Sequence, residues 1–225
     1  YPSIDVKYPD TRKDTTVKDD YFGTVVADPY RWLENDTSAE TANWVKAENE
    51  ITQGYLSKIP FRDAIKKRYE ALYNYEKYSA PFKEGKYTYY YLNTGLQNQS
   101  VLYRQEADNA TPEVFLDPNT FSSDGTTSLS GIAFSNDGSM AAYNISEGGS
   151  DWQKIVVMDA ITKKQTNDTL ELKFSGASWK GNEGFYYSNY HRGGGSVLSA
   201  KNENHKLYYH KLGTSQNDDK VVYGN

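Results

Sequence analysis

The chain contains three histidines, His191, His205 and His210, and imidazole is the general base that a Ser/His/Asp triad requires. In such a triad the imidazole takes the proton of a serine hydroxyl, while a carboxylate holds the ring in the correct tautomer. All three histidines lie in or beside the Gly-, Ser- and Asn-rich stretch 190–206, where a solvated loop is the default structure. We therefore predict that none of them is a catalytic base.

A serine nucleophile in an α/β hydrolase occupies a Gly-x-Ser-x-Gly turn, in which the second glycine lets the turn pack tightly against the sheet. The chain contains no such turn. Gly195-Ser196 is followed by Val197-Leu198, and Gly149-Ser150 is followed by Asp151-Trp152, so both lack the second glycine. We assign no catalytic residue in this sequence.

Metal and cofactor motifs are also incomplete. Asp124-Gly125 and Asp137-Gly138 lack the alternating carboxylates of a calcium loop, and we predict that both are two-residue hairpin turns. Gly193-Gly194-Gly195 lacks the Lys-Ser/Thr of a phosphate-binding loop and is better interpreted as a flexible linker. With 0 cysteines the chain has no disulfide, zinc thiolate or thiol nucleophile. We therefore expect no metal and no cofactor.

The composition excludes two classes of partner. The net charge of −5 is spread along the 225 residues, so we expect no nucleic acid as a partner. No apolar run approaches the ~20 residues of a membrane span, so we expect no membrane insertion. The lack of cysteine, together with a start at Tyr1 rather than Met, favours a processed, periplasmic or secreted protein, with a cytoplasmic protein as the alternative.

The chain has two parts with different residue patterns, and we predict the boundary between them near residues 74–80. From Ala39 to about Tyr73, apolar residues recur at helical intervals, Thr37 or Ser38 can cap the first helix, and Pro60 separates two helices. Each helix has one apolar face, but this part of the chain has no sheet on which to bury it. We therefore expect residues 1–74 to need a partner supplied by a later part of the polypeptide.

The residue pattern of the second part is strand-like and repetitive. Tyrosine occurs 21 times, and aromatic runs are separated by Gly, Asn and Asp clusters, which is typical of short, half-buried strands. The unit 132–143 returns as 176–187, with Phe134 and Trp179 in equivalent places, 45 residues apart. A four-stranded unit that recurs every ~40–50 residues predicts β-propeller blades. An antiparallel sandwich is the alternative, but it does not require a fixed interval.

Three segments carry a family resemblance: Asp28-Pro29-Tyr30-Arg31-Trp32-Leu33-Glu34, then Asn93-Thr94-Gly95-Leu96-Gln97-Asn98-Gln99, then Gly148-Gly149-Ser150-Asp151-Trp152. In this order and at these intervals they resemble the amino-terminal third of the prolyl oligopeptidases. The resemblance implies a mainly β chain in which residues 75–225 form the first three or so blades of a seven-bladed propeller. It implies that residues 1–74 are a helical arm belonging to an α/β-hydrolase domain.

The same resemblance implies a function for the whole protein. The family members are serine endopeptidases that hydrolyse short proline-containing peptides after proline, and their propeller restricts access to the active site. Their catalytic serine, aspartate and histidine lie beyond the point where this sequence stops, so we expect this portion to be inactive alone and to pair with the carboxyl-terminal hydrolase domain of the same polypeptide, as a monomer. Two alternatives remain: a non-catalytic propeller that binds a peptide or protein, and an oligopeptidase B-like peptidase that cleaves after Lys or Arg, since 28–34 is shared with that relative.

Two places are implied to touch substrate. Phe174 matches a propeller phenylalanine that lines the subsite for the residue two before the scissile proline, whereas periodicity alone favours a blade-core aromatic. The segment 190–206 corresponds to a mobile propeller loop, for which we predict gating or disorder. The grouped side chains of Asp28, Arg31, Trp32 and Glu34 are interpreted as architectural.

Overall fold

The computed structural model of the protein describes residues 6–107, 109–190 and 202–224. These residues form two compact units that divide between Ala71 and Leu72. The domain boundaries stay a prediction: residues 1–74 are assigned to a hydrolase domain and residues 75–225 to a propeller. The two units are described in turn.

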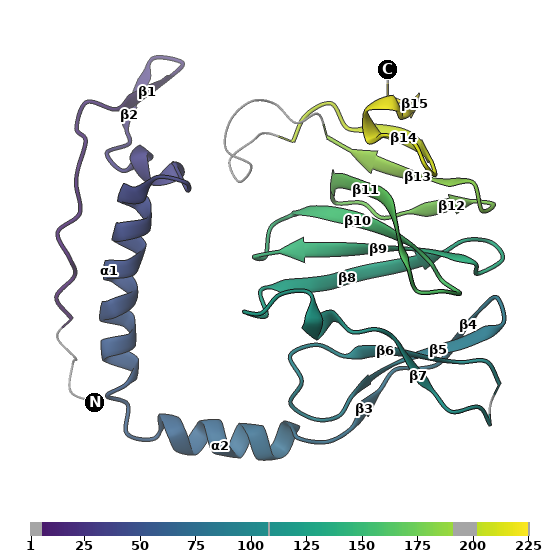
Figure 1. The fold of residues 1–225 in the computed structure, drawn as a ribbon. Helices are drawn as coiled ribbons and strands as arrows, with labels where there is room; N and C mark the ends of the chain where they lie inside the picture. Colours follow the sequence, from purple (N-terminus) through teal and green to yellow (C-terminus); the bar gives the residue numbers. More distant parts are fainter. Residues whose placement is uncertain (1–5, 108, 191–201, 225) are drawn as a thin grey trace. The chain divides into compact units, whose positions relative to one another are not determined.

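The first unit begins with a small hairpin and continues with helices. Its elements are β1 (Lys18–Tyr21), β2 (Thr24–Ala27), the 3-10 helix η1 (Arg31–Glu34), α1 (Ala39–Leu56) and α2 (Arg62–Tyr73) (Figure 1). The side chain of Ser38 accepts a hydrogen bond of 3.1 Å from the backbone N–H of Thr41 at the start of α1. This is the N-cap that the sequence predicted. The β1–β2 hairpin was not predicted.

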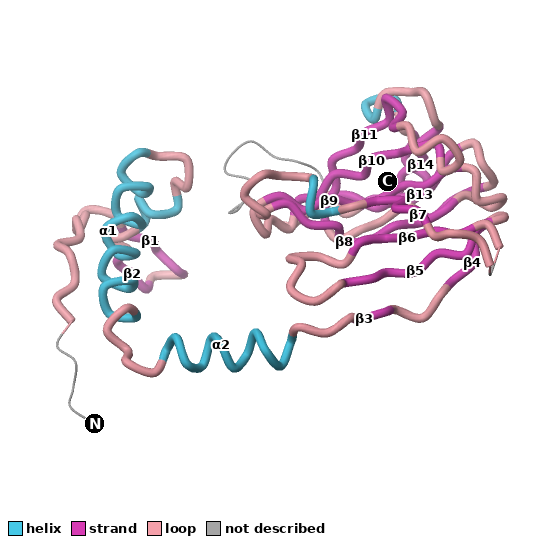
Figure 2. Tube along the Cα trace, turned by 60° about the horizontal axis from the view of Figure 1, so that its bottom comes forward, coloured by secondary structure: helices cyan, strands magenta, loops and turns pink. Residues whose placement is uncertain are grey.

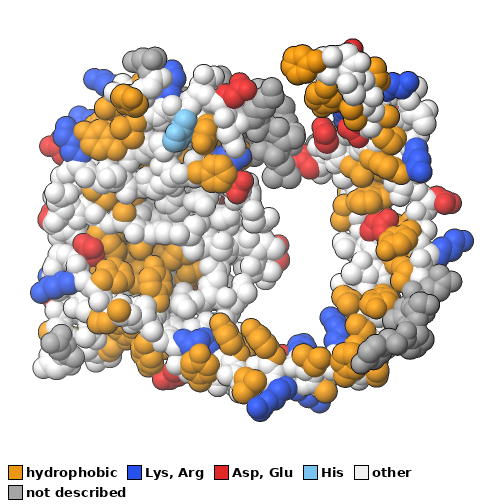
Figure 3. All heavy atoms as spheres, turned by 180° about the vertical axis from the view of Figure 1, so that it is seen from behind, with side chains coloured by type: hydrophobic (Ala, Val, Ile, Leu, Met, Phe, Trp, Pro, Cys, Tyr) orange, Lys and Arg blue, Asp and Glu red, His pale blue; other side chains and the backbone are white. Residues whose placement is uncertain are grey.

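The helices leave most of their apolar side chains in contact with solvent. Thr41 is the one buried residue of α1, and α2 has none. Hydrophobic side chains therefore lie along the surface of the helical segment (Figure 3), and the exposed ones include Val45, Ile65 and Leu72. Since a helix gains most of its stability by burying an apolar face, this pattern agrees with the expectation that the segment needs a partner.

The segment 28–34 connects parts of the first unit through ion pairs and hydrogen bonds. Arg31 pairs with Asp19 of β1 and, at 3.0 Å, with Asp28, and these two carboxylates raise the pKa of the guanidinium. The indole nitrogen of Trp32 donates to the carbonyl oxygen of Arg12 over 3.1 Å, and the Arg12 guanidinium lies 5.0 Å from the centre of the Trp32 ring. These contacts support the architectural interpretation of Arg31 and Trp32.

The second unit consists of three consecutive antiparallel sheets, each a meander (Figures 1 and 2). The first contains β3 (Lys77–Tyr78), β4 (Phe82–Glu84), β5 (Tyr87–Asn93), β6 (Val101–Gln105) and β7 (Glu113–Leu116). The second contains β8 (Thr127–Phe134), β9 (Met140–Glu147), β10 (Trp152–Asp159) and β11 (Gln165–Lys173), and the third contains β12 (Ser178–Lys180), β13 (Gly184–Asn189), β14 (Lys206–Lys211) and β15 (Lys220–Tyr223). The short 3-10 helices η2 (Pro118–Thr120) and η3 (Gln216–Asp218) complete the unit. Successive meanders of this kind confirm the prediction of propeller blades.

The 45-residue repeat corresponds to a physical contact between neighbouring sheets. The β8–β9 turn meets the β12–β13 turn, where the backbone N–H of Asn136 donates to the carbonyl oxygen of Gly181 over 3.2 Å. The side-chain amide of Asn182 donates to Asp137 over 2.7 Å. Asp137-Gly138 is a hairpin turn, as predicted. The prediction was wrong for Asp124-Gly125, which lies between η2 and β8 and therefore connects two sheets.

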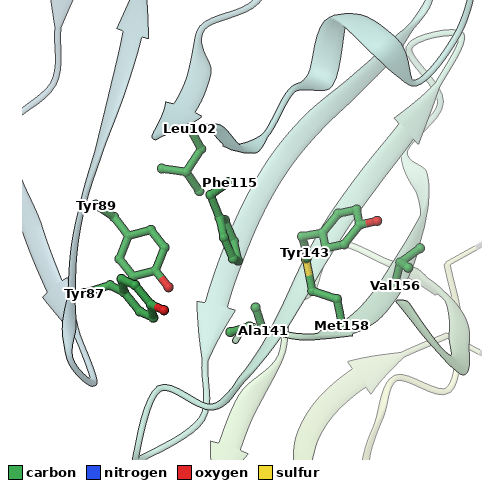
Figure 4. Packing of buried hydrophobic residues seen from close by; sticks show 9 residues of the cluster. Tyr87, Tyr89, Leu102, Phe115, Ala141, Tyr143, Val156 and Met158 are labelled. Atoms are coloured by element: carbon green, nitrogen blue, oxygen red, sulfur yellow. The ribbon is translucent and has the colours of Figure 1, made fainter. Parts of the chain in front are cut away.

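Each pair of neighbouring sheets shares a hydrophobic core. Between the first and second sheets, buried rings and aliphatic side chains pack together, among them Tyr89, Phe115 and Tyr143 (Figure 4). A second cluster lies between the second and third sheets. Strand β10 serves both clusters, since Val156 and Met158 belong to the first and Ile155 and Val157 to the second. Side chains alternate between the two faces of a strand, which explains why the segment 155–158 of β10, buried on both faces, is apolar at every position.

Candidate substrate-binding site

Phe174 lies immediately after β11 and points away from the core. Its φ angle is 56° and its side chain is 56% exposed. A bulky residue rarely adopts positive φ, and such strain is found where the surrounding structure requires one particular backbone direction. The interpretation of Phe174 as a blade-core aromatic is therefore wrong, while its role in substrate binding stays a prediction.

Two neighbours hold the Phe174 ring. The ammonium group of Lys173, whose side chain is buried, lies 5.0 Å from the centre of the ring. The Tyr190 ring meets it edge-on at 6.3 Å, and the ring of His205 stacks on Tyr190 at 4.4 Å. The three rings of Phe174, Tyr190 and His205 form an aromatic patch that can pack against apolar side chains without demanding matched hydrogen bonds.

A groove of about 440 Å³ lies beside Phe174. One side is formed by the segment 174–177 and the other by residues 130–133 of β8, with Asn144 and Gln153 between them. Strand β8 is the end strand of its sheet. Its pairing with β9 shifts between Leu129 and Gly131, which marks a β-bulge. Among the described residues that line the groove, none has an ionisable side chain, so this lining is suited to binding an uncharged chain rather than to acid–base chemistry.

The histidines occupy three different environments. His191 lies outside the described residues, as do all but the ends of the predicted loop 190–206 and the Gly193–Gly195 linker. His205 is exposed, in agreement with a solvated segment. For His210 the prediction of a solvated loop is wrong, because this residue lies in β14 and is 0% exposed. The apolar and aromatic run Leu207-Tyr208-Tyr209 just before it was the signal that could have placed His210 in a strand.

The imidazole of His210 is enclosed by two aspartates. Its Nδ1 lies 2.8 Å from an oxygen of Asp219, and its Nε2 lies 3.2 Å from an oxygen of Asp168 in β11. Tyr187 donates a hydrogen bond of 2.7 Å to the other oxygen of Asp219, and burial together with this bond raises the pKa of the Tyr187 hydroxyl. With both ring nitrogens occupied and no solvent access, His210 holds the second and third sheets together and does not meet substrate.

The acidic turns are also structural. Asp124 accepts from the backbone N–H of Thr126 over 3.0 Å, and Asp137 accepts from that of Ser139 over 2.8 Å. Hydrogen bonds from Thr126 and Ser139 lower the pKa of the respective carboxyls. Among the residues that the structure describes, no three His, Asp or Glu side chains lie close enough together to hold a metal ion. In the same part of the chain, no helix is both long and apolar enough to cross a membrane.

Comparisons with known proteins agree over nearly the whole chain. Residues 9–225 match the family model of the prolyl oligopeptidase N-terminal β-propeller domain. The prolyl endopeptidase of Elizabethkingia meningoseptica is 57% identical over 221 residues, covering 97% of this chain and 31% of the relative. Prolyl oligopeptidase A of Amanita bisporigera is 35% identical over 249 residues, covering 96% of this chain and 32% of the relative.

Solved structures give the same picture. A structure from a study of two prolyl endopeptidases has a TM-score of 0.82 at 30% identity, covering 97% of this chain and 33% of that one. Prolyl oligopeptidase B from Galerina marginata, bound to a 35mer hydrolysis and macrocyclization substrate, has a TM-score of 0.76 at 32% identity and covers 97% of this chain and 34% of its own. Oligopeptidase B from Leishmania major, at 18% identity and a TM-score of 0.77, covers 98% of this chain and 33% of its own and shares the fold.

The chain spans about a third of the length of the curated relatives that it matches. Within that third, the family model covers both the propeller sheets and most of the helical segment that precedes them. The chain belongs to the prolyl oligopeptidase family and forms part of its N-terminal β-propeller region.

Proposed function

We propose that the whole protein containing this chain is a serine endopeptidase that hydrolyses short peptides after proline. The observation that carries the proposal is the 57% identity to a prolyl endopeptidase over 97% of the chain. The described residues contain no catalytic serine with a histidine base, so the chemistry would belong to a hydrolase domain elsewhere in the polypeptide. An oligopeptidase B-like activity has weaker support, because that likeness rests on 18% identity.

In this proposal the chain has three roles. The propeller blades restrict access to the active site and exclude folded proteins, and Phe174 contacts the peptide two residues before the scissile proline. The exposed apolar faces of α1 and α2 dock on the hydrolase domain, which supplies the partner that these helices lack. A monomeric whole protein, exported to the periplasm or the medium, stays part of the proposal, and the absence of cysteine fits export.

The activity is tested with peptides that differ only at the residue before the scissile bond. We expect the whole protein to cleave the peptide with proline at this position and to leave those with arginine and alanine intact, because a proline pocket rejects longer or unconstrained side chains. One serine-reactive phosphonate bearing proline should label the protein once, as measured by intact mass. Cleavage after arginine would support the oligopeptidase B-like alternative, and binding without cleavage or labelling would support a non-catalytic propeller.

Phe174 is tested in the same assay. We expect Phe174→Ala to raise KM for a proline peptide about tenfold with little change in kcat, because the lost ring contact stabilises the ground state and the transition state equally. Ile161→Ala is the control, since Ile161 is 43% exposed in the turn at the opposite end of β11. An unchanged KM for Phe174→Ala would remove this residue from the substrate site.

A further inference from the structure

The groove beside Phe174 contains two side-chain amides whose orientation is fixed by their neighbours. The amide nitrogen of Asn144 lies 2.9 Å from the carbonyl oxygen of Ser175, which can only accept a hydrogen bond. The same nitrogen lies 2.9 Å from the side chain of Gln153. A second donor would repel it there, so Gln153 must turn its oxygen toward Asn144.

This arrangement leaves one acceptor and one donor for a ligand. Asn144 retains its oxygen Oδ1 and Gln153 retains its amide nitrogen Nε2, and neither atom has a hydrogen-bond partner among the described residues. Asn144 is only 6% exposed, but its Oδ1 is not among the fully buried side-chain atoms that lack a partner, so this oxygen is accessible from the groove. Its Oδ1 lies 3.8 Å from the point that a Cβ of Gly176 would occupy, which places this oxygen on the Gly176 side of the groove.

Strand β8, the end strand of its sheet, lies beside these amides. Earlier along this edge, the N–H of Leu129 donates to Gln99 over 3.0 Å, and later the carbonyl of Ala133 accepts from Trp179 over 3.0 Å. Gly131 lies between them, paired with Asn144 across the β8–β9 ladder. Apart from Gly131 and its two neighbours, no described atom lies within 4 Å of the point where a Gly131 side chain would begin. Because cross-strand partners share a face of the sheet, the space above Gly131 on the Asn144 side is open.

We propose that this groove binds the main chain of an extended peptide, on the amino side of the residue that contacts Phe174. A peptide unit offers one N–H and one C=O, which match Asn144 Oδ1 and Gln153 Nε2, and the open space above Gly131 on the same face leaves room for the backbone of the peptide. The groove's described lining residues are all uncharged, so the contact recognises the backbone rather than a charged side chain. The inference rests on the proposed function, because it extends the peptide site beyond Phe174.

The sharpest test is Gln153→Glu in the whole protein. This change keeps the oxygen that accepts from Asn144, replaces the donor by a second oxygen and adds a negative charge, which the control variant also adds. Two uncharged peptides are compared, one that ends at the residue contacting Phe174 and one that carries three further residues on its amino side. We expect the ratio of KM for the long peptide to KM for the short peptide to rise about tenfold, which is the loss of one buried hydrogen bond. Gln105→Glu is the matched control, because Gln105 is the last residue of β6, which belongs to the first sheet and does not line the groove.

A second variant narrows the groove without replacing either amide. Gly131→Val places a side chain in open space at an ordinary φ, and valine suits a strand, so the fold should be retained. We expect the same rise in the ratio, measured both as KM and as Kd by titration calorimetry. Unchanged ratios in both variants of an enzyme that cleaves after proline would overturn the groove inference. Absence of proline cleavage would instead contradict the proposed function, and the Kd values would still decide whether the groove binds peptide.

Discussion

Replacing Gly138 with alanine is expected to destabilise the protein by about 2–5 kcal/mol, since a residue with a Cβ in the left-handed region costs ~1–2 kcal/mol and overpacking adds ~1–3 kcal/mol. Gly138 has a φ of 73° in the β8–β9 turn. An added Cβ would lie 2.5 Å from the backbone nitrogen of Gly85, 2.7 Å from its Cα and 2.8 Å from the carbonyl carbon of Glu84. These are backbone atoms of the β4–β5 turn, which cannot rotate away as a side chain can.

Gly181→Ala separates the two causes. Gly181 occupies the equivalent turn of the third sheet with a φ of 59°, but no atom lies within 4 Å of its Cβ position. We expect this variant to lose only the left-handed penalty of ~1–2 kcal/mol. The free energy of unfolding is measured for both variants by chemical denaturation, with tryptophan fluorescence as the signal. If both variants lose the same free energy of unfolding, the close approach of the β8–β9 turn to the β4–β5 turn adds nothing to the cost of the Gly138 substitution.

These turns show what could be predicted from the sequence. Asp137-Gly138 and Gly181-Asn182 identify turns because glycine tolerates positive φ at little cost, and this signal is local. Their 45-residue spacing indicated equivalent positions in successive blades. The sequence did not show that the turns touch, because a hydrogen bond between Asn182 and Asp137 depends on how two sheets pack.

Polar residues inside strands were the hardest to predict. Asn and His usually lie on the surface or in loops, yet Asn144 and His210 are both buried by sheets that come from distant parts of the sequence. Nothing in the residues adjacent to Asn144 indicates that Ser175 and Gln153 would fix its amide. For Phe174, the resemblance identified the position, but its exposure follows from a φ of 56° that no composition rule predicts. Local patterns thus gave the strands, while the candidate site depends on contacts between them.

Removing the His210 ring is expected to have an effect as large as the Gly138 substitution. His210→Ala leaves the side chains of Asp168 and Asp219, which are 5% and 1% exposed, without the group that lies between them. Breaking a buried ionic network by deleting one member costs about 3–5 kcal/mol, because the remaining charge is uncompensated. Asp168 belongs to the second sheet and His210 to the third, so the junction between the sheets should open first. Amide hydrogen exchange in β11 and β14 measures this opening directly.

Two further variants test whether charge is the reason. His205→Ala removes the same side chain from an exposed position stacked on Tyr190, and we expect a change within ~0.5 kcal/mol. Adding Asp219→Asn to His210→Ala removes one of the two uncompensated carboxylates while keeping an acceptor for the Tyr187 hydroxyl. The double variant should therefore be more stable than His210→Ala by about 1–2 kcal/mol, a coupling of the size found within buried networks. If the double variant is instead less stable than His210→Ala, the loss reflects the volume of the missing ring rather than charge, and His210 acts as a packing residue between the sheets.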